Sequence, residues 1–68
     1  MKELLKYGFT DESYGSVELY FYRLDSGMLA VYGDSGNVYF KPLNEENFNL
    51  ATGASVEQVI NILKAIQI

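Results

Sequence analysis

Apolar and polar positions alternate along the middle of the chain, and this alternation predicts three strands. They run from Ser16 to Leu24, from Met28 to Tyr32 and from Val38 to Lys41. A period of two is typical of a strand, because successive side chains point to opposite faces of the sheet. Two short turns that each contain Asp-Ser-Gly separate these segments. The pattern therefore predicts an antiparallel three-stranded meander.

The C-terminal part of the chain has a helical period instead. Its apolar stripe consists of Val56, Val59, Ile60, Leu63 and Ile66. This spacing predicts a helix from Val56 to Ile68. Ser55 is the expected N-cap, and Gln58 completes a capping box with it. We expect the stripe to pack on one face of the sheet.

The N-terminus predicts a second, shorter helix from Lys2 to Tyr7. Gly8 fits the residue that ends this helix, and Phe9 then folds back toward Leu4. The residues from Thr10 to Gly15 form an expected polar turn. A helix this short needs packing against the rest of the chain.

Phe48 and Leu50 alternate with Asn47 and Asn49, so this segment is a candidate fourth strand. The chain is thus expected to form one α+β domain over residues 1–68. It contains a short N-terminal helix, an antiparallel meander of three or four strands, and a C-terminal helix packed on one sheet face.

The predicted strands carry bulky side chains on both faces. In the first strand one side holds Val17, Leu19 and Phe21, and the other holds Glu18, Tyr20, Tyr22 and Leu24. An antiparallel sheet with only one covered face normally shows polar residues on the other. Either the second face binds a partner, or each helix covers one face and the tyrosine hydroxyls reach water.

The strand register stays open at this point. A first loop of three residues places Phe21 opposite Val31 and Tyr20 opposite Tyr32. The second turn has two or three residues, and this choice decides whether Val38 lies on the face of Val31 or on that of Tyr32.

A tyrosine-rich sheet face is a candidate binding surface, because tyrosine is enriched in the cores of protein interfaces. The candidate contacts are Tyr20, Tyr22, Tyr32 and Tyr39, with Met28 as an adaptable neighbour. The candidate rim consists of the turn acids Asp11, Glu12, Asp25, Asp34, Glu45 and Glu46.

Composition disfavours catalysis. The 68 residues include no Cys and no His, which removes disulfides, the common zinc ligand sets and the Ser-His and Cys-His nucleophiles. The paired acids Asp11-Glu12 and Glu45-Glu46 are expected in solvated loops. The turn from Gly33 to Gly36 lacks the lysine of a phosphate-binding loop. We therefore expect no enzyme activity, cofactor or metal site.

The formal net charge of −4 narrows the choice of partners. It disfavours nucleic acid and anionic membranes, which attract basic chains, and it is compatible with a protein partner that has a basic surface. The charged residues near Met1 do not resemble a signal peptide, and no apolar run is long enough to span a membrane. The absence of Cys fits a reducing cytoplasm.

These observations predict a non-catalytic protein-binding module. By class analogy, small acidic domains without catalytic residues resemble phage or mobile-element inhibitors of host defence or nucleic-acid enzymes, such as anti-CRISPR proteins. The alternative is a structural homo-oligomer, for example a homodimer, that pairs through the tyrosine face or through the third strand as a sheet edge. An aromatic sheet that stacks RNA bases is disfavoured by the few cations on the strands.

Overall fold

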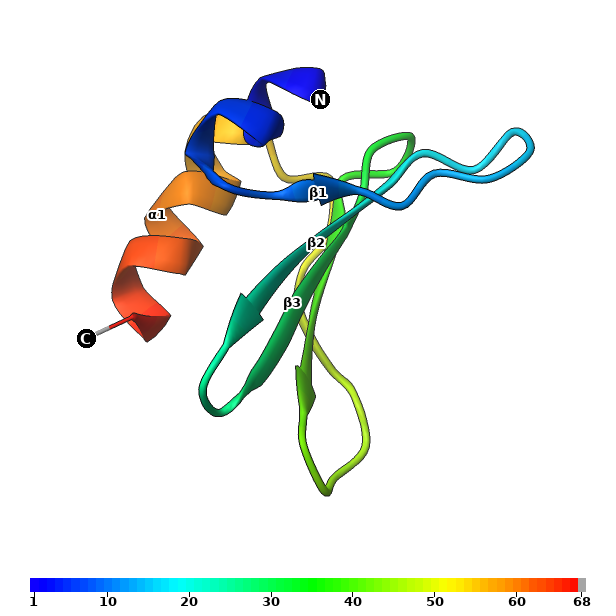
Figure 1. Cartoon of the computed structure of the whole chain (residues 1–68). Helices are drawn as coiled ribbons and strands as arrows, with labels where there is room; N and C mark the ends of the chain where they lie inside the picture. The colour runs from blue at the N-terminus through cyan, green and yellow to red at the C-terminus, as the bar shows by residue number, and fades with distance from the viewer. Residues whose placement is uncertain (68) are drawn as a thin grey trace.

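The computed structural model describes residues 1–67, within which five strands form one antiparallel sheet in the order of the sequence (Figure 1). The strands are β1 (Thr10–Asp11), β2 (Leu19–Leu24), β3 (Gly27–Tyr32), β4 (Asn37–Pro42) and β5 (Phe48–Ala51). A 3-10 helix, η1 (Lys2–Tyr7), precedes the sheet, and an α-helix, α1 (Val56–Ile66), follows it. The α+β prediction is confirmed, with five strands in place of three or four.

Both helices begin or end where the sequence predicts. The Ser55 hydroxyl accepts a hydrogen bond from the Gln58 backbone N–H at 3.2 Å, and the Gln58 side chain accepts one from the Ser55 N–H at 2.8 Å. This capping box satisfies two backbone donors at the start of α1. Gly8, with φ of 99°, ends η1 in the left-handed conformation that glycine tolerates. The prediction extended α1 to Ile68, which lies outside the described residues.

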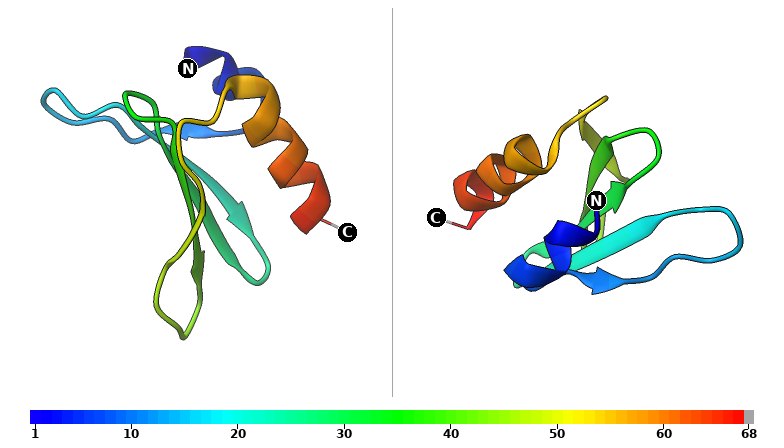
Figure 2. Two further views of the ribbon diagram at one scale, coloured as in Figure 1. Left: turned by 180° about the vertical axis from the view of Figure 1, so that it is seen from behind. Right: turned by 90° about the horizontal axis from the view of Figure 1, so that it is seen from above.

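η1 and α1 pack on the same face of the sheet, here called the inner face (Figure 2). The core joins strand residues to residues of both helices. Its members are Leu4, Phe9, Tyr20, Leu29, Val31, Val38, Ala54, Val59, Ile60 and Leu63. The alternative arrangement, with one helix on each face, is therefore wrong.

The turn between β2 and β3 contains two residues, so the register differs by one residue from the expected one. Tyr20 lies opposite Val31, and Phe21 lies opposite Ala30. Gly27 belongs to β3, where a Cβ atom would lie 2.3 Å from the Lys41 carbonyl oxygen. The glycine thus permits the close approach of β4 and does not serve as a third loop residue.

The pairing of the remaining strands shows which residues share a face of the sheet and which strands lie at its edges. Val38 lies opposite Val31 and joins the inner face, as one of the two predicted registers required. β5 confirms the candidate fourth strand, so β4 is an internal strand and not the expected edge. β1 was expected to be part of a polar turn, but Thr10 and Asp11 pair with β2.

Candidate functional site

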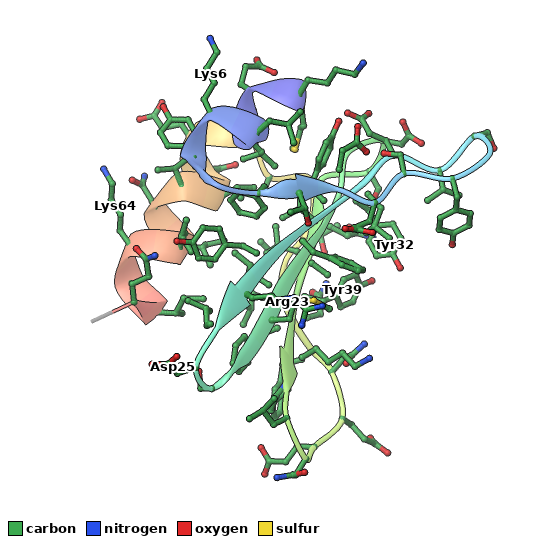
Figure 3. All side chains as sticks on the ribbon, viewed as in Figure 1. Lys6, Arg23, Asp25, Tyr32, Tyr39 and Lys64 are labelled. Atoms are coloured by element: carbon green, nitrogen blue, oxygen red, sulfur yellow. The ribbon has the colours of Figure 1, made fainter. Side chains whose placement is uncertain are left out.

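The sheet face turned away from η1 and α1, here called the outer face, is not covered by a helix among residues 1–67 (Figure 3). Successive side chains of a strand point to opposite faces of the sheet, so the residues that alternate with those of the inner face belong to the outer face. It consists of Leu19, Phe21 and Arg23 of β2, Met28, Ala30 and Tyr32 of β3, and Asn37, Tyr39 and Lys41 of β4. Most of this face is apolar or aromatic.

Cross-strand pairing arranges the outer face in three rows. Their members are Leu19–Tyr32–Asn37, Phe21–Ala30–Tyr39 and Arg23–Met28–Lys41. The Tyr32 and Tyr39 rings meet edge to face with centroids 5.8 Å apart, a favoured aromatic geometry. The small Ala30 between the larger side chains leaves a hollow of about 160 Å³, which Tyr32, Tyr39 and Asn47 also line.

The third row gives the outer face a positive end. Arg23 and Lys41 are exposed, and neither makes an ion pair with another described residue. No carboxylate occupies an outer-face position. An open hollow of about 370 Å³ lies beside this row and extends to Pro42 and Leu43. The outer face therefore combines aromatic surface with two free cations, although the whole chain is acidic.

Two of the four candidate tyrosines lie on the wrong face for partner binding. Tyr20 has no exposed surface and belongs to the core, so its assignment as a contact residue is corrected. Tyr22 is also on the inner face, where its ring packs against Phe9 with centroids 5.2 Å apart. Its hydroxyl accepts a hydrogen bond from the Gln67 side chain at 2.9 Å. Tyr22 therefore connects the sheet to the end of α1.

Tyr32, Tyr39 and Met28 do lie together on the outer face, and each is half-buried. Sequence reasoning missed Phe21, which occupies the same row as Tyr39, and the cations Arg23 and Lys41. The alternating pattern had already placed Phe21 and Tyr20 on opposite faces of β2. The sequence did not show which of these two faces the helices cover.

The six candidate rim acids are all exposed, but they do not surround one surface. Asp25, Glu45 and Glu46 lie in the turns at one end of the sheet, whereas Asp11, Glu12 and Asp34 lie at the other. Hydrogen bonding from Ser13, whose backbone N–H donates to Asp11 at 3.0 Å, lowers the pKa of the Asp11 carboxyl. Asp11, at the end of β1, is thus bound to the loop that follows this strand.

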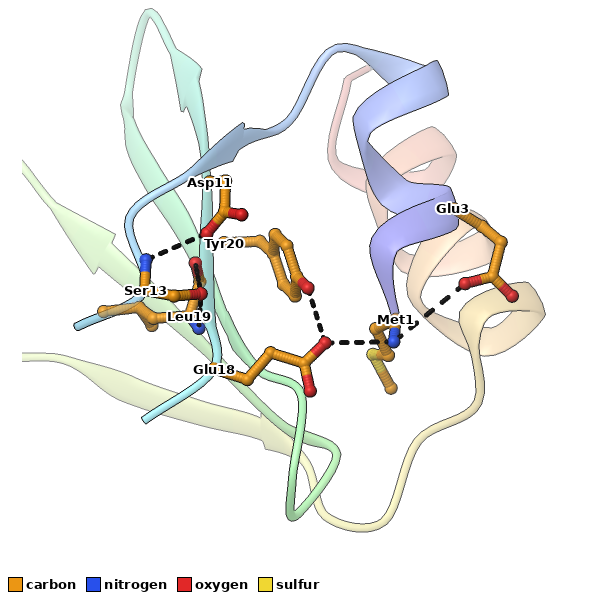
Figure 4. Close-up of polar contacts among 7 residues, drawn as sticks. All are labelled: Met1, Glu3, Asp11, Ser13, Glu18, Leu19 and Tyr20. Atoms are coloured by element: carbon orange, nitrogen blue, oxygen red, sulfur yellow. Dashed lines mark hydrogen bonds and ion pairs between the residues drawn. The ribbon is translucent and has the colours of Figure 1, made fainter. Parts of the chain in front are cut away.

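A partly buried polar cluster connects the N-terminus to the sheet (Figure 4). The Tyr20 hydroxyl and the Met1 ammonium both donate to one Glu18 carboxylate oxygen, the ammonium at 3.1 Å. The hydrogen bond from Tyr20, followed by that from the ammonium, lowers the pKa of Glu18. Burial, followed by the hydrogen bond to Glu18 and the charge of that carboxylate, raises the pKa of the Tyr20 phenol. With every member bonded to another, this cluster is structural.

Replacement of Tyr20 by Phe is expected to destabilise the fold near neutral pH, and to do so less in acid. Because the folded-state pKa of Glu18 is lowered, its stabilising contribution is complete above the unfolded value of 4.5 and is lost as pH falls through the folded value. Tyr20→Phe removes the main cause of that shift. The difference in melting temperature between the two proteins should be largest at pH 7 and should shrink as the pH falls below 4.5. A difference that stays the same as the solution is acidified would contradict this assignment.

No group of three or more Asp or Glu side chains within residues 1–67 is arranged to hold a metal ion. Neither described helix has the length and apolar character needed to cross a membrane. Comparison with known protein families, curated proteins and solved structures found no match.

Proposed function

We propose that this protein is a non-catalytic protein-binding module and that the outer face contacts the partner. The observation that carries the proposal is a half-buried aromatic surface that no described helix covers, formed by Phe21, Tyr32 and Tyr39 around Ala30. The inner face already has its two helices, so the chain can complete its core without using these side chains. Tyrosine and methionine are enriched in the centres of protein interfaces.

The charge of the outer face suggests which partner fits. Arg23 and Lys41 flank Met28 in one row, and the outer-face positions include no carboxylate. A complementary partner carries an apolar ridge for the aromatic rows and an acidic group for this positive end. A partner with a basic surface would contact only the acidic turns at the two ends of the sheet.

Inhibition of a nucleic-acid enzyme by charge mimicry is a narrower form of this proposal, in which the acids replace nucleic-acid phosphates. It needs carboxylates gathered on one surface. The separation of Asp25, Glu45 and Glu46 from Asp11, Glu12 and Asp34 supports the apolar outer face as the contact surface instead. An inhibitor that uses the outer face remains within the proposal.

The double variant Tyr32→Ser, Tyr39→Ser is expected to lose partner binding while it keeps the fold. Both side chains lie outside the core, so the loss of stability should be only about 1–2 kcal/mol. Affinity capture with quantitative mass spectrometry, from the cells in which the protein acts, compares this variant with the wild type. The matched control, Tyr7→Ser with Tyr14→Ser, also removes two tyrosines, which are 53% and 62% exposed and lie outside the outer face.

The proposal predicts that some proteins are captured by the wild type and by the control variant but not by the outer-face variant. Identical capture by all three chains would contradict it. Labelled single-stranded RNA and DNA provide a further comparison, because aromatic side chains beside cations also stack bases. Oligonucleotide binding that depends on Tyr32 and Tyr39 would replace the protein partner with nucleic acid and overturn the proposal.

A further inference from the structure

The open hollow of about 370 Å³ at the positive end of the outer face has mostly apolar walls. Besides Arg23 and Lys41, it is lined by Phe21, Leu24, Gly27, Met28, Pro42 and Leu43. Contiguous apolar surface of this kind marks an interaction site more often than scattered apolar side chains do, and Leu43 is 73% exposed. Binding pockets begin at about 300 Å³, so the hollow has room for one or two side chains of a partner.

Two cations flank this apolar surface. Met28 pairs with Arg23 on β2 and with Lys41 on β4, so the backbones of the two cationic residues lie about 10 Å apart. Both side chains are exposed, and neither forms an ion pair within residues 1–67. Because both are long, one anion above Met28 can contact the two of them together.

The acids of the neighbouring turns favour one kind of anion. Asp25, Glu45 and Glu46 are exposed at this end of the sheet, but none of the three lines the hollow. In Figure 3 the Asp25 side chain points away from Arg23. A nucleic acid would bring several phosphates close to these carboxylates, which repel them. A single carboxylate beside an apolar group can enter the hollow and reach the two cations alone.

We propose that this hollow binds an acidic residue of the protein partner, together with an apolar residue that adjoins it in the partner's sequence. The carboxylate accepts hydrogen bonds from Arg23 and Lys41, because the guanidinium fork matches the two carboxylate oxygens. The apolar neighbour packs against Met28 and Leu43. This inference rests on the proposed function, since it takes the outer face as the contact surface, and it adds the chemistry that anchors the partner there.

Peptide titration followed by the amide NMR signals of the protein tests the site. The probes are the capped tripeptides acetyl-Leu-Glu-Leu-amide and acetyl-Phe-Glu-Leu-amide, and the same peptides with Gln in place of Glu. At millimolar concentration the Glu peptides should shift the amide signals of Arg23, Met28 and Lys41. They should bind about fivefold more tightly than the Gln peptides, an effect of roughly 1 kcal/mol that fits two exposed ion pairs.

The variant Arg23→Gln with Lys41→Gln is expected to bind the Glu and Gln peptides equally. Lys6→Gln with Lys64→Gln is the matched control, because it removes two exposed lysines from η1 and α1 and changes the net charge by the same amount (Figure 3). The control should keep the preference for Glu. A cooperative melting transition in both variants would show that both are folded.

Three results would overturn the inference. They are the absence of any shift at Arg23, Met28 and Lys41, equal binding of the Glu and Gln peptides by the wild type, and a preference for Glu that the variant without these two cations retains.

The capture experiment described above distinguishes this failure from that of the proposed function. If Arg23→Gln with Lys41→Gln retains the proteins that Tyr32→Ser with Tyr39→Ser loses, the outer face binds its partner without this anchor, and only the inference fails. If the tyrosine variant captures the same proteins as the wild type while the Glu peptides bind in the hollow, the proposed function fails and the carboxylate site stands.

Discussion

Replacement of Tyr20 by Ala is expected to unfold much of the protein. Tyr20 has no exposed surface and packs among core residues of both helices and the sheet. Removal of a buried aromatic ring costs about 3–5 kcal/mol. A domain of this length has a total stability of roughly 3–10 kcal/mol. Urea denaturation followed by circular dichroism should therefore show a transition at much lower denaturant concentration, or none.

Tyr39→Ala is the matched comparison for this result. Tyr39 is half-buried on the outer face and lies outside the core cluster. We expect its truncation to cost about 1 kcal/mol. If Tyr39→Ala proves as destabilising as Tyr20→Ala, the outer face is part of a core and is not free for a partner.

The second large effect is expected at Gly36, which is buried and has a φ of 70°. Its carbonyl oxygen accepts a hydrogen bond from the Ala54 N–H at 2.9 Å. A Cβ atom at position 36 would lie 2.6 Å from the Ala54 nitrogen and 2.8 Å from its carbonyl oxygen. Gly36→Ala therefore combines left-handed strain of about 1–2 kcal/mol with overpacking of about 1–3 kcal/mol. The free energy of unfolding should fall by that sum.

Gly53→Ala separates the two contributions. Gly53 has a φ of 67°, but an added Cβ would have no neighbour within 4 Å. It should lose only the 1–2 kcal/mol of conformational strain. Equal losses at Gly36 and Gly53 in the same denaturation experiment would show that the contact between the β3–β4 turn and Ala54 does not matter.

Sequence reasoning succeeded where a local pattern determines the structure. The capping box of Ser55 and Gln58 fixes the start of α1, and Gly8 fixes the end of η1. β1 was missed because a two-residue polar strand has no periodic pattern and exists only through its pairing with Phe21 and Tyr20. The β2–β3 register was wrong because the role of Gly27 depends on Lys41, which is far away in the sequence.

The prediction of the candidate site was incomplete for the same reason, because it too depends on contacts between distant parts of the chain. Alternation correctly separated Tyr20 and Tyr22 from Phe21 along β2, but both sets are apolar. The choice between them depends on where α1 packs, and this is a contact between distant parts of the chain. A strand pattern with one polar face would have shown which face of the sheet the helices cover. Candidate residues were therefore taken from both faces, and Phe21 was left out.

The central claim is that the outer face binds another protein, and photo-crosslinking at position 39 tests it most directly. Tyr39 is replaced by p-benzoylphenylalanine in one chain. Tyr7, which is 53% exposed on η1, is replaced in a control chain. After irradiation in the cells in which the protein acts, we predict a covalent adduct with a partner from position 39 and not from position 7. No adduct from position 39, or the same adduct from both positions, would contradict the claim.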